Sequence, residues 1–198
     1  MKLLRIDASA RLNDSITRQL ADELIGHLRE RHAELEMTQR ELSNGLPLLD
    51  ETWVGANFTP AEQRSAEQNQ ALNLSHVLIE ELKAADAMVL AVPIYNFGVP
   101  AVMKAWIDLI TRAKVTFRYT EQGAEGLLRD RPVYLVMASG GTPVDSDMDF
   151  AARYLRFILN FIGIRDIRMI AADQMNVDPD NALQRARAHM VEAMNSPR

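Results

Sequence analysis

Short runs of apolar residues alternate along this chain with longer segments in which apolar residues recur at helical spacing. The run Ala87–Val92 contains only apolar residues, which is typical of a central parallel strand covered on both faces. Leu20, Leu24 and Leu28 instead recur every four residues and mark one face of a helix. A repeated order of strand, helix and strand predicts a parallel sheet with helices on both of its faces.

This alternation repeats about five times. Strands are predicted at residues 3–6, 35–42, 87–92, 133–137 and 167–172. Helices are predicted around Leu20–Leu28, from about Pro60, from about Pro100, from about Ser146 to Phe161, and over Asn181–Met194. Residues 44–59 are expected to form a long loop because they contain Gly, Pro and Asn. The helix after Pro60 carries an apolar stripe at Leu74, Val77, Leu78 and Leu82.

Composition restricts the possible functions. The 198 residues are enough for one α/β domain over 1–198 and few for two. The 22 Lys and Arg residues against 27 Asp and Glu give a net charge of −5, which disfavours non-specific binding to nucleic acid or anionic membranes. Cysteine is absent, and the four histidines form no pair at zinc spacing, so no metal site is expected. With no signal-peptide pattern and no apolar run of ~20 residues, we expect a cytoplasmic protein.

Doubly wound sheets bind ligands at the carboxyl ends of their strands. The loop after the first strand contains neither GxGxxG nor GxxxxGK[ST], so both nucleotide fingerprints fail. It offers hydroxyls at Ser9, Ser15 and Thr17 before a helix, where free N–H groups and the helix dipole attract an anion. This arrangement suits a phosphate monoester. The alternative is that Ser15 only caps the helix.

The loop after the third strand places Tyr95, Asn96, Phe97 and Gly98 together. Its peptide N–H groups suit the heteroatoms of a flat ring, and its aromatics offer apolar walls; the alternative is a turn whose aromatics pack into the core. A phosphoacceptor regulator is disfavoured, because it needs an Asp where this strand ends in Pro93. After the fourth strand, residues 138–143 are glycine-rich and allow the backbone to lie against a planar ligand.

Several longer stretches carry a resemblance that covers nearly the whole chain. They are Pro93–Phe97 with Lys104–Asp108, Val115–Thr120 followed by Gly123, Gly126 and Leu127, Asn160–Ile164, and Leu46–Asp50. Together they resemble the FMN-dependent NADH-azoreductase family of flavodoxin-like NAD(P)H:quinone oxidoreductases. The resemblance implies an α/β, flavodoxin-like, doubly wound five-stranded parallel sheet in the order 2-1-3-4-5, with helices on both faces.

The resemblance also implies bound FMN. By its motifs, the phosphate is held by Ser9, Ser15, Ile16 and Thr17. The ring and ribityl chain are contacted by Ile94, Tyr95, Asn96 and Phe97, and the pyrimidine end by Ala138, Ser139, Gly140 and Gly141. Family members often have Ser-Arg where this chain has Ala138-Ser139, which leaves the flavin potential and substrate preference open.

The implied activity is ping-pong, two-electron hydride transfer from NADH through FMN to quinones and aromatic azo compounds, with NADPH as the other possible donor and no catalytic acid–base dyad. The family is a homodimer with a shared active site, in which Tyr119 and Phe161 wall the substrate pocket. For Phe161 the alternative is a core position beside Leu155 and Ile158.

Two other classes of function compete with this one. A flavodoxin-type electron carrier has little use for an added segment such as residues 114–131. A hydrolase needs a GxSxG elbow or a metal cluster, and the sequence has neither.

Overall fold

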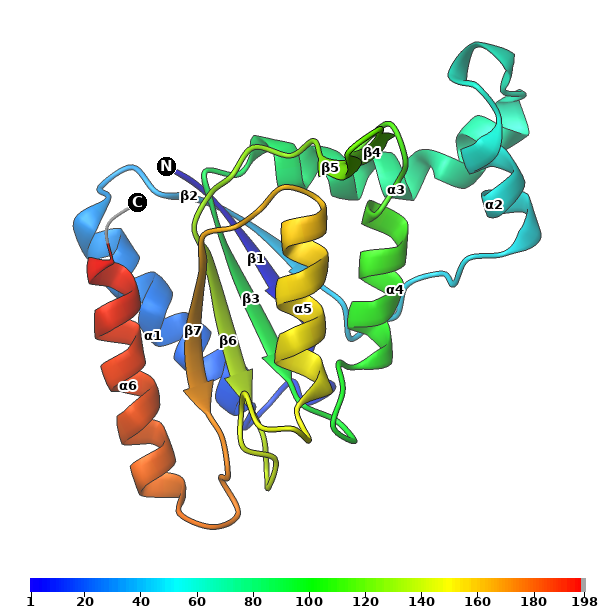
Figure 1. The fold of residues 1–198 in the computed structure, drawn as a ribbon. Coiled ribbons are helices and arrows are strands. Elements are labelled where there is room, and N and C mark those ends of the chain that lie inside the picture. Colours follow the sequence, from blue (N-terminus) through cyan, green and yellow to red (C-terminus); the bar gives the residue numbers. More distant parts are fainter. Residues whose placement is uncertain (197–198) are drawn as a thin grey trace.

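Five parallel strands form the central sheet of the computed structural model, which describes residues 1–196 (Figure 1). They are β1 (Lys2–Asp7), β2 (Glu36–Glu41), β3 (Ala87–Pro93), β6 (Val133–Ala138) and β7 (Ile167–Ala172). Their spatial order is β2-β1-β3-β6-β7. Because β6 and β7 are the fourth and fifth strands of this sheet along the chain, the order is 2-1-3-4-5 and the expected flavodoxin-like fold class is confirmed. That residues 1–198 form a single domain stays a prediction.

Helices cover both faces of the sheet (Figure 1). One face carries α1 (Ile16–Arg31) and α6 (Pro179–Asn195). The other carries α3 (Ala66–Ala84), α4 (Ala101–Ile110) and α5 (Phe150–Phe161). Three smaller elements lie outside these layers: the helix α2 (Glu51–Phe58), a 3-10 turn (Ala61–Gln63), and a hairpin of β4 (Phe117–Thr120) and β5 (Gly123–Gly126).

The central strand β3 is fully buried, as its apolar run predicts. Met88, Leu90 and Val92 pack into the core under α3, α4 and α5, whereas Val89 and Ala91 pack into the core under α1 and α6. Successive side chains of a strand point to opposite faces, so one short run contributes to both cores. This double burial fixes the register of β3 against its neighbours.

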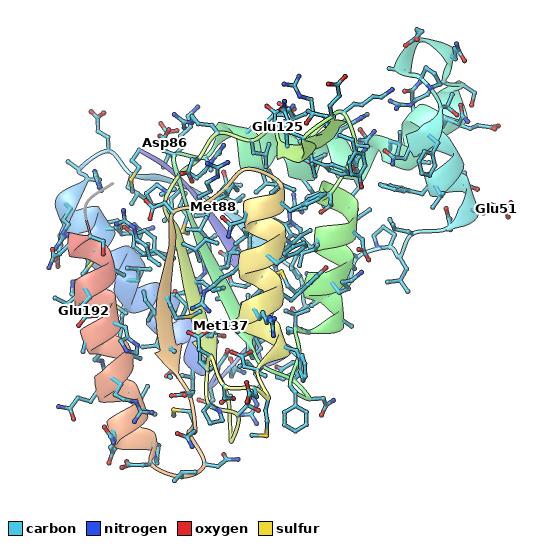
Figure 2. The ribbon with its side chains drawn as sticks, in the orientation of Figure 1. Glu51, Asp86, Met88, Glu125, Met137 and Glu192 are labelled. Carbon is cyan, nitrogen blue, oxygen red and sulfur yellow. The ribbon has the colours of Figure 1, made fainter. Side chains whose placement is uncertain are left out.

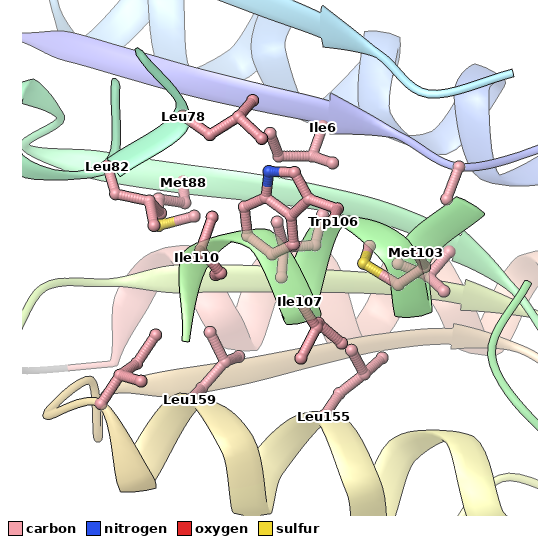
Figure 3. Close-up of a cluster of buried hydrophobic side chains, with 14 of the residues drawn as sticks. Ile6, Leu78, Leu82, Met88, Met103, Trp106, Ile107, Ile110, Leu155 and Leu159 are labelled. Atoms are coloured by element: carbon pink, nitrogen blue, oxygen red, sulfur yellow. The ribbon is translucent and has the colours of Figure 1, made fainter. Parts of the chain in front are cut away.

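Trp106 of α4 anchors the larger core. Its side chain is 1% exposed, and Figure 3 shows the indole beside Ile6 of β1 and Leu78 of α3. Met88 and Met137 also lie in the interior, while Glu51, Glu125 and Glu192 lie on the outside (Figure 2). No helix among residues 1–196 combines the length and the apolar character that a membrane span needs.

The structure corrects the expected loop at residues 44–59. Its second half is the helix α2, which Asp50 caps by accepting a hydrogen bond from Trp53 N (2.7 Å). Asp50 Oδ1 thus bonds a helical N–H group that has no partner inside the helix, and burial of Trp53 holds the helix against the body. Of the Gly and Pro residues on which the loop expectation rested, Gly45 and Pro47 precede this cap, whereas Gly55 lies inside α2.

Two predicted helix starts and one residue of a predicted apolar stripe, Val77, were also wrong. The helix expected from about Pro60 begins at Ala66, after a reciprocal capping box between Ser65 and Gln68. Val77 is 43% exposed, so the buried face follows Leu72, Leu78, Ile79 and Leu82. The helix expected from about Ser146 begins at Phe150, because Asp149 accepts from Ala151 N and Ala152 N.

The β4–β5 hairpin packs backbone against backbone on the end of α5. Leu128 N donates to Ile162 O (3.0 Å). A Cβ atom on Gly126 would lie 2.1 Å from Gly163 N, and one on Gly163 would lie 2.5 Å from Leu128 O. Gly163 also has a φ of +108°, a conformation that costs other residues strain. Glycine is therefore required at both positions.

We expect Gly163→Ala to lower the free energy of unfolding by about 2 kcal/mol or more, because the added methyl group meets backbone and the conformation is strained. Gly26→Ala is the control, since nothing lies within 4 Å of that added atom in α1; it should raise stability by up to about 1 kcal/mol. Urea unfolding followed by circular dichroism measures both. Equal midpoints for Gly163→Ala and the wild type would contradict the packing described.

Candidate functional site

A crevice of about 290 Å³ opens at the carboxyl ends of β1, β3 and β6. It is lined by Ser9, Arg11, Asp14, Ser15, Ile16, Thr17, Pro93, Ile94, Tyr95, Ala138, Ser139, Gly140, Met175 and Asn176. Most of the residues predicted to bind a cofactor are therefore brought together. Asn96, Phe97 and Gly141 lie in the same loops but do not line the crevice itself.

The N-terminus of α1 forms one wall of the crevice. Its first intrahelical hydrogen bond runs from Gln19 N to Ser15 O (3.0 Å), so the N–H groups of Ile16, Thr17 and Arg18 have no acceptor within the helix. The first turn contains no acidic side chain. These free donors and the positive end of the helix dipole together favour an anion.

Two buried hydroxyls add to this wall. Ser15 Oγ and Thr17 Oγ1 lie 3.2 Å apart. Ser15 occupies the capping position but makes no side-chain capping hydrogen bond, so the interpretation of Ser15 as a cap alone is disfavoured. Asp14 has a φ of +54° and is exposed on the rim of the crevice. Ser9, 2% exposed, accepts a hydrogen bond from Arg11 N (3.2 Å).

The turn after β3 is tight and strained. Tyr95 and Gly98 exchange two backbone hydrogen bonds of 3.0 Å, and the residues between them, Asn96 (φ +48°) and Phe97 (φ +68°), are both left-handed. A left-handed Phe costs of the order of 1–3 kcal/mol, so surrounding contacts must hold it. One such contact is the bond from Phe150 N to Phe97 O (2.9 Å).

The aromatics of this turn do not pack into the core. Tyr95 is 38% exposed and Phe97 is 50% exposed. The alternative in which they are core residues is therefore wrong. The hydrogen bonds of the turn hold the peptide groups of Asn96 and Phe97, and the Phe97 side chain, at its tip.

The turn after β6 is organised by Ser139. Its hydroxyl donates to Thr142 O and accepts from Gln174 N (3.3 Å), so the side chain is occupied within the protein. Gly140 lies against Asn176, where an added Cβ would be 2.7 Å from Nδ2. Gly141 has open space around it. The turn can thus offer backbone groups, rather than the Ser139 hydroxyl, to a ligand.

Sequence reasoning missed five lining residues, of which Pro93 is the last residue of β3. Met175 and Asn176 follow β7, and the same carboxyl-end rule applied to that fifth strand would have found them. Their loop is held to the Ser139 turn by bonds from Met175 N to Ser139 O (3.0 Å) and from Asn176 N to Gly140 O (2.9 Å). Arg11 and Asp14 lay in a loop already singled out, but nothing local shows which way they point.

A second hollow, of about 370 Å³, lies at the opposite end of the sheet. Its charged groups are already satisfied: Arg129 Nη2 lies 3.2 Å from Asp86 Oδ1, and Asp130 accepts from the backbone N–H groups of Arg165 and Asp166. Within residues 1–196, no group of three or more His, Asp or Glu side chains could hold a metal ion. The crevice is therefore the better candidate for a ligand site.

Tyr119 and Phe161 do not wall the crevice of their own chain. They gather around Phe117, with ring centroids 5.5 Å and 4.6 Å from it. Phe161 ends α5, next to the hairpin, whereas Phe150 begins α5 beside the strained turn (Figure 1). Twelve helical residues separate these ends by about 16 Å. Tyr119 is 75% exposed, and Phe161 is half-buried rather than a full core residue.

Comparison with known proteins places this geometry in a family. A family model described as "Flavodoxin-like fold" matches residues 1–194. The chain is 50% identical over 192 residues to "FMN-dependent NADH:quinone oxidoreductase 1" of Hahella chejuensis, covering 97% of this chain and 94% of that relative. It is also 50% identical over 194 residues to the "FMN-dependent NADH:quinone oxidoreductase" of Thiobacillus denitrificans, covering 98% and 95%. The chain belongs to the FMN-dependent NADH:quinone oxidoreductase family.

Solved structures agree with this assignment. The crystal structure of an FMN-dependent NADH-azoreductase from Bacillus anthracis, in complex with FMN, is 26% identical, has a TM-score of 0.86, and covers 98% of both chains. The resemblance to FMN-dependent NADH-azoreductases that the sequence carries is thereby confirmed.

Behind the first loop, Glu41 pairs with Arg18 at 2.6 Å (Oε2 to Nη1). Burial alone would raise the pKa of Glu41, but hydrogen bonds from Arg18 and from Ser43 outweigh it and lower the pKa to about 2. The pKa in the folded state thus lies below its ordinary value of 4.5, so the pair stabilises the fold fully above that pH and loses its contribution as pH falls toward 2.

We expect Glu41→Gln to lower the free energy of unfolding at pH 7 by about 1–2 kcal/mol. The same substitution should make the decline in stability between pH 4.5 and pH 2 shallower, because one depressed carboxyl group no longer titrates. Denaturant unfolding at a series of pH values measures both quantities. Parallel pH curves for variant and wild type would show that the pair is not formed.

Proposed function

We infer that this chain is an FMN-dependent NADH:quinone oxidoreductase that also reduces aromatic azo compounds. Relatives that are 50% identical over nearly their whole length carry the quinone oxidoreductase name, and the Bacillus anthracis structure is named an NADH-azoreductase. The structural observation that carries the function is the meeting of three loops in one crevice: an acid-free helix N-terminus, a strained aromatic turn and a glycine turn.

The residues of the crevice fit FMN. The phosphate would be held by Ser9, Ser15, Ile16 and Thr17, because they combine buried hydroxyls with N–H groups that have no acceptor within α1. The cradle contains no carboxylate except Asp14, which is on the rim. A phosphate monoester there gains charge-assisted hydrogen bonds without facing a buried negative side chain.

The other two loops fit the ring system. The isoalloxazine and ribityl chain would be contacted by Ile94, Tyr95, Asn96 and Phe97, whose strained turn presents peptide groups at a fixed place. The pyrimidine end of the isoalloxazine ring would be lined by Ala138, Ser139, Gly140 and Gly141. Open space around Gly141 supports a close approach of the ring to the backbone there.

When bound, FMN supplies the two-electron chemistry, accepting a hydride from NADH and passing it to the acceptor. The protein binds and orients. Arg11, Asp14 and Tyr95 are the ionisable residues of the crevice lining, and we assign no acid–base dyad among them. Backbone N–H groups of the glycine turn stabilise negative charge at the pyrimidine end. The accompanying proton comes from water or from the substrate.

An electron carrier of the flavodoxin type would need no aromatic wall. The β4–β5 hairpin, with Tyr119 three-quarters exposed above Phe117 and Phe161, favours an enzyme with a substrate pocket. NADPH in place of NADH, and the physiological acceptor, are open choices. We place the enzyme in the cytoplasm, where its nicotinamide donor is made.

We propose a homodimer with shared active sites, in which a second copy of the chain supplies the substrate wall. The outer face of α5 exposes two large aromatic side chains, Phe150 at 64% and Phe157 at 65%. It contains a hollow of about 640 Å³ beside Val99 and Tyr154. A monomer seldom leaves large aromatics gathered on one face in this way.

A two-fold symmetric dimer that uses this face would bring the substrate wall of one copy to the crevice of the other. An isologous interface whose two-fold axis is perpendicular to α5 would pair the Phe150 end of one copy with the Phe161 end of the other. Tyr119 and Phe161 of the partner subunit then lie near the strained turn of the first copy. The site and its wall, about a helix length apart in one chain, are thus united across the interface.

We expect Ser15→Asp to abolish the visible flavin spectrum of the purified protein. Asp caps a helix as well as Ser does, so the fold is kept, but its charge repels the phosphate. Ser65→Asp, at the N-terminus of α3, is the matched control and should purify yellow. Absorbance near the flavin maxima and NADH oxidation with menadione are the measurements. A wild-type protein that takes up no FMN when it is added would overturn the proposed function.

Mixing two impaired variants tests the shared site. One variant is Ser15→Asp; the other combines Tyr119→Ser with Phe161→Leu. If the wall comes from the partner subunit, exchange of subunits should restore about a quarter of wild-type activity, because half of the dimers are mixed and each holds one intact site. If each chain builds its own wall, every site carries a defect and no activity returns.

A further inference from the structure

Arg18 lies in the first turn of α1, yet its side chain does not line the crevice. It runs behind the first loop instead and is 11% exposed. There Nη2 donates to Ser9 O and Nε donates to Arg11 O, both at 3.0 Å. One guanidinium therefore holds two carbonyl groups of the loop that carries Ser9.

Holding these carbonyls on the inner side orients the loop. In a trans peptide the C=O and the following N–H point in opposite directions. With Ser9 O directed at Arg18, the N–H of Ala10 must face the other way, and it donates to Tyr95 Oη (3.2 Å). The same rule turns the N–H of Leu12 away from Arg18. The peptide planes of the loop are thereby fixed, with the N–H of Ala10 directed at Tyr95 and the N–H of Arg11 directed at the Ser9 hydroxyl.

Glu41 holds Arg18 in turn. Its carboxylate accepts from both terminal nitrogens of Arg18, at 2.6 Å and 2.8 Å. Glu41 is the last residue of β2, and its Oε1 also accepts from Ser43 N (2.9 Å), which anchors the carboxylate at the sheet edge. Asp7, fully buried, lies 3.7 Å from Arg18 Nη1. A planar, bidentate pair of this kind fixes direction as well as distance.

We propose that Arg18 is a positioning residue for the FMN phosphate: clamped by Glu41, it holds the carbonyl groups of Ser9 and Arg11 and so keeps the Ser9 hydroxyl, which lines the crevice, in place to face the phosphate. The inference rests on the proposed function, since it concerns how that site holds its cofactor. Arg18 acts through the loop and makes no contact with the flavin.

Two other roles for Arg18 give different results. A positive charge acting at a distance would attract phosphate from any geometry, so Arg18→Lys would suffice, and Glu41→Gln, which adds net positive charge, would tighten FMN binding. A general structural brace would weaken every ligand of the crevice alike. Positioning instead requires the forked guanidinium and its carboxylate partner, and it affects only ligands that carry a phosphate.

The experiment compares FMN with riboflavin, which has the same ring and ribityl chain but no phosphate. Apoprotein is titrated with each flavin by fluorescence quenching, for the wild type, Arg18→Met, Arg18→Lys and Glu41→Gln. Arg40→Met is the matched control, because Arg40 is the neighbouring residue of β2 and pairs with Glu81 of α3 (Nε to Oε2, 3.2 Å), away from the loop. Melting temperatures of the apoproteins are recorded alongside.

Positioning predicts that Arg18→Met raises the Kd for FMN by about tenfold or more, the loss expected when a charge-assisted network is removed. The Kd for riboflavin should change by less than about twofold, because the Tyr95 turn keeps its own hydrogen bonds and its bond from Phe150. Arg18→Lys should behave like Arg18→Met, and Glu41→Gln should weaken FMN binding. Arg40→Met should leave both Kd values unchanged.

Tighter FMN binding by Glu41→Gln, or full FMN affinity in Arg18→Lys, would overturn positioning in favour of long-range attraction. Equal losses for FMN and riboflavin would overturn it in favour of a structural brace. If Arg18→Met does not fold, the lysine and glutamine variants decide the question. A wild type that binds no FMN would overturn the proposed function itself, whereas a wild type that binds FMN and variants that match it would overturn only this inference.

Discussion

The parallel register of β1, β3 and β6 determines where this chain can bind a ligand. Asp7 pairs with Ala91, and Pro93 pairs with Ala138, so the strands end within two residues of one another. The loops that follow them must therefore begin side by side, however far apart they are in the sequence. The register in turn depends on β3, whose side chains are buried on both faces. A slip of this strand by one residue would turn each of its side chains toward the opposite core.

The ends of the loops are held by contacts outside the crevice. The Tyr95 turn keeps two left-handed residues because Phe150 N bonds Phe97 O at the start of α5. The first loop is held from behind by Arg18, and the glycine turn is closed by the Ser139 hydroxyl. These groups make hydrogen bonds within the protein and fix the shape of the loops. The backbone donors of α1 are thereby left free, which is what an uncharged cradle for a phosphate requires.

Local pattern was enough to predict the sheet and the loops that follow it. The apolar run Ala87–Val92 predicts a buried strand, and the hydroxyls of Ser9 and Ser15 before a helix predict a phosphate site, each from only a few neighbouring residues. The helix α2 was missed because its evidence is a single capping contact from Asp50 and the burial of Trp53. The role of Arg18 depends on a partner 23 residues away, at the end of a different strand, and no local spacing encodes that. The distance from Tyr119 to the crevice is likewise a property of the assembled layers.

The central claim is that one crevice, formed where three strands end together, holds a single phosphorylated flavin. A crystal structure of the protein grown with FMN tests this most directly. We expect the FMN phosphate to lie within hydrogen-bond distance of the Ser15 hydroxyl and of the N–H groups of Ile16 and Thr17. The isoalloxazine ring should lie against the Tyr95 turn. A flavin seated elsewhere, or a phosphate pointing into solvent away from α1, would contradict it.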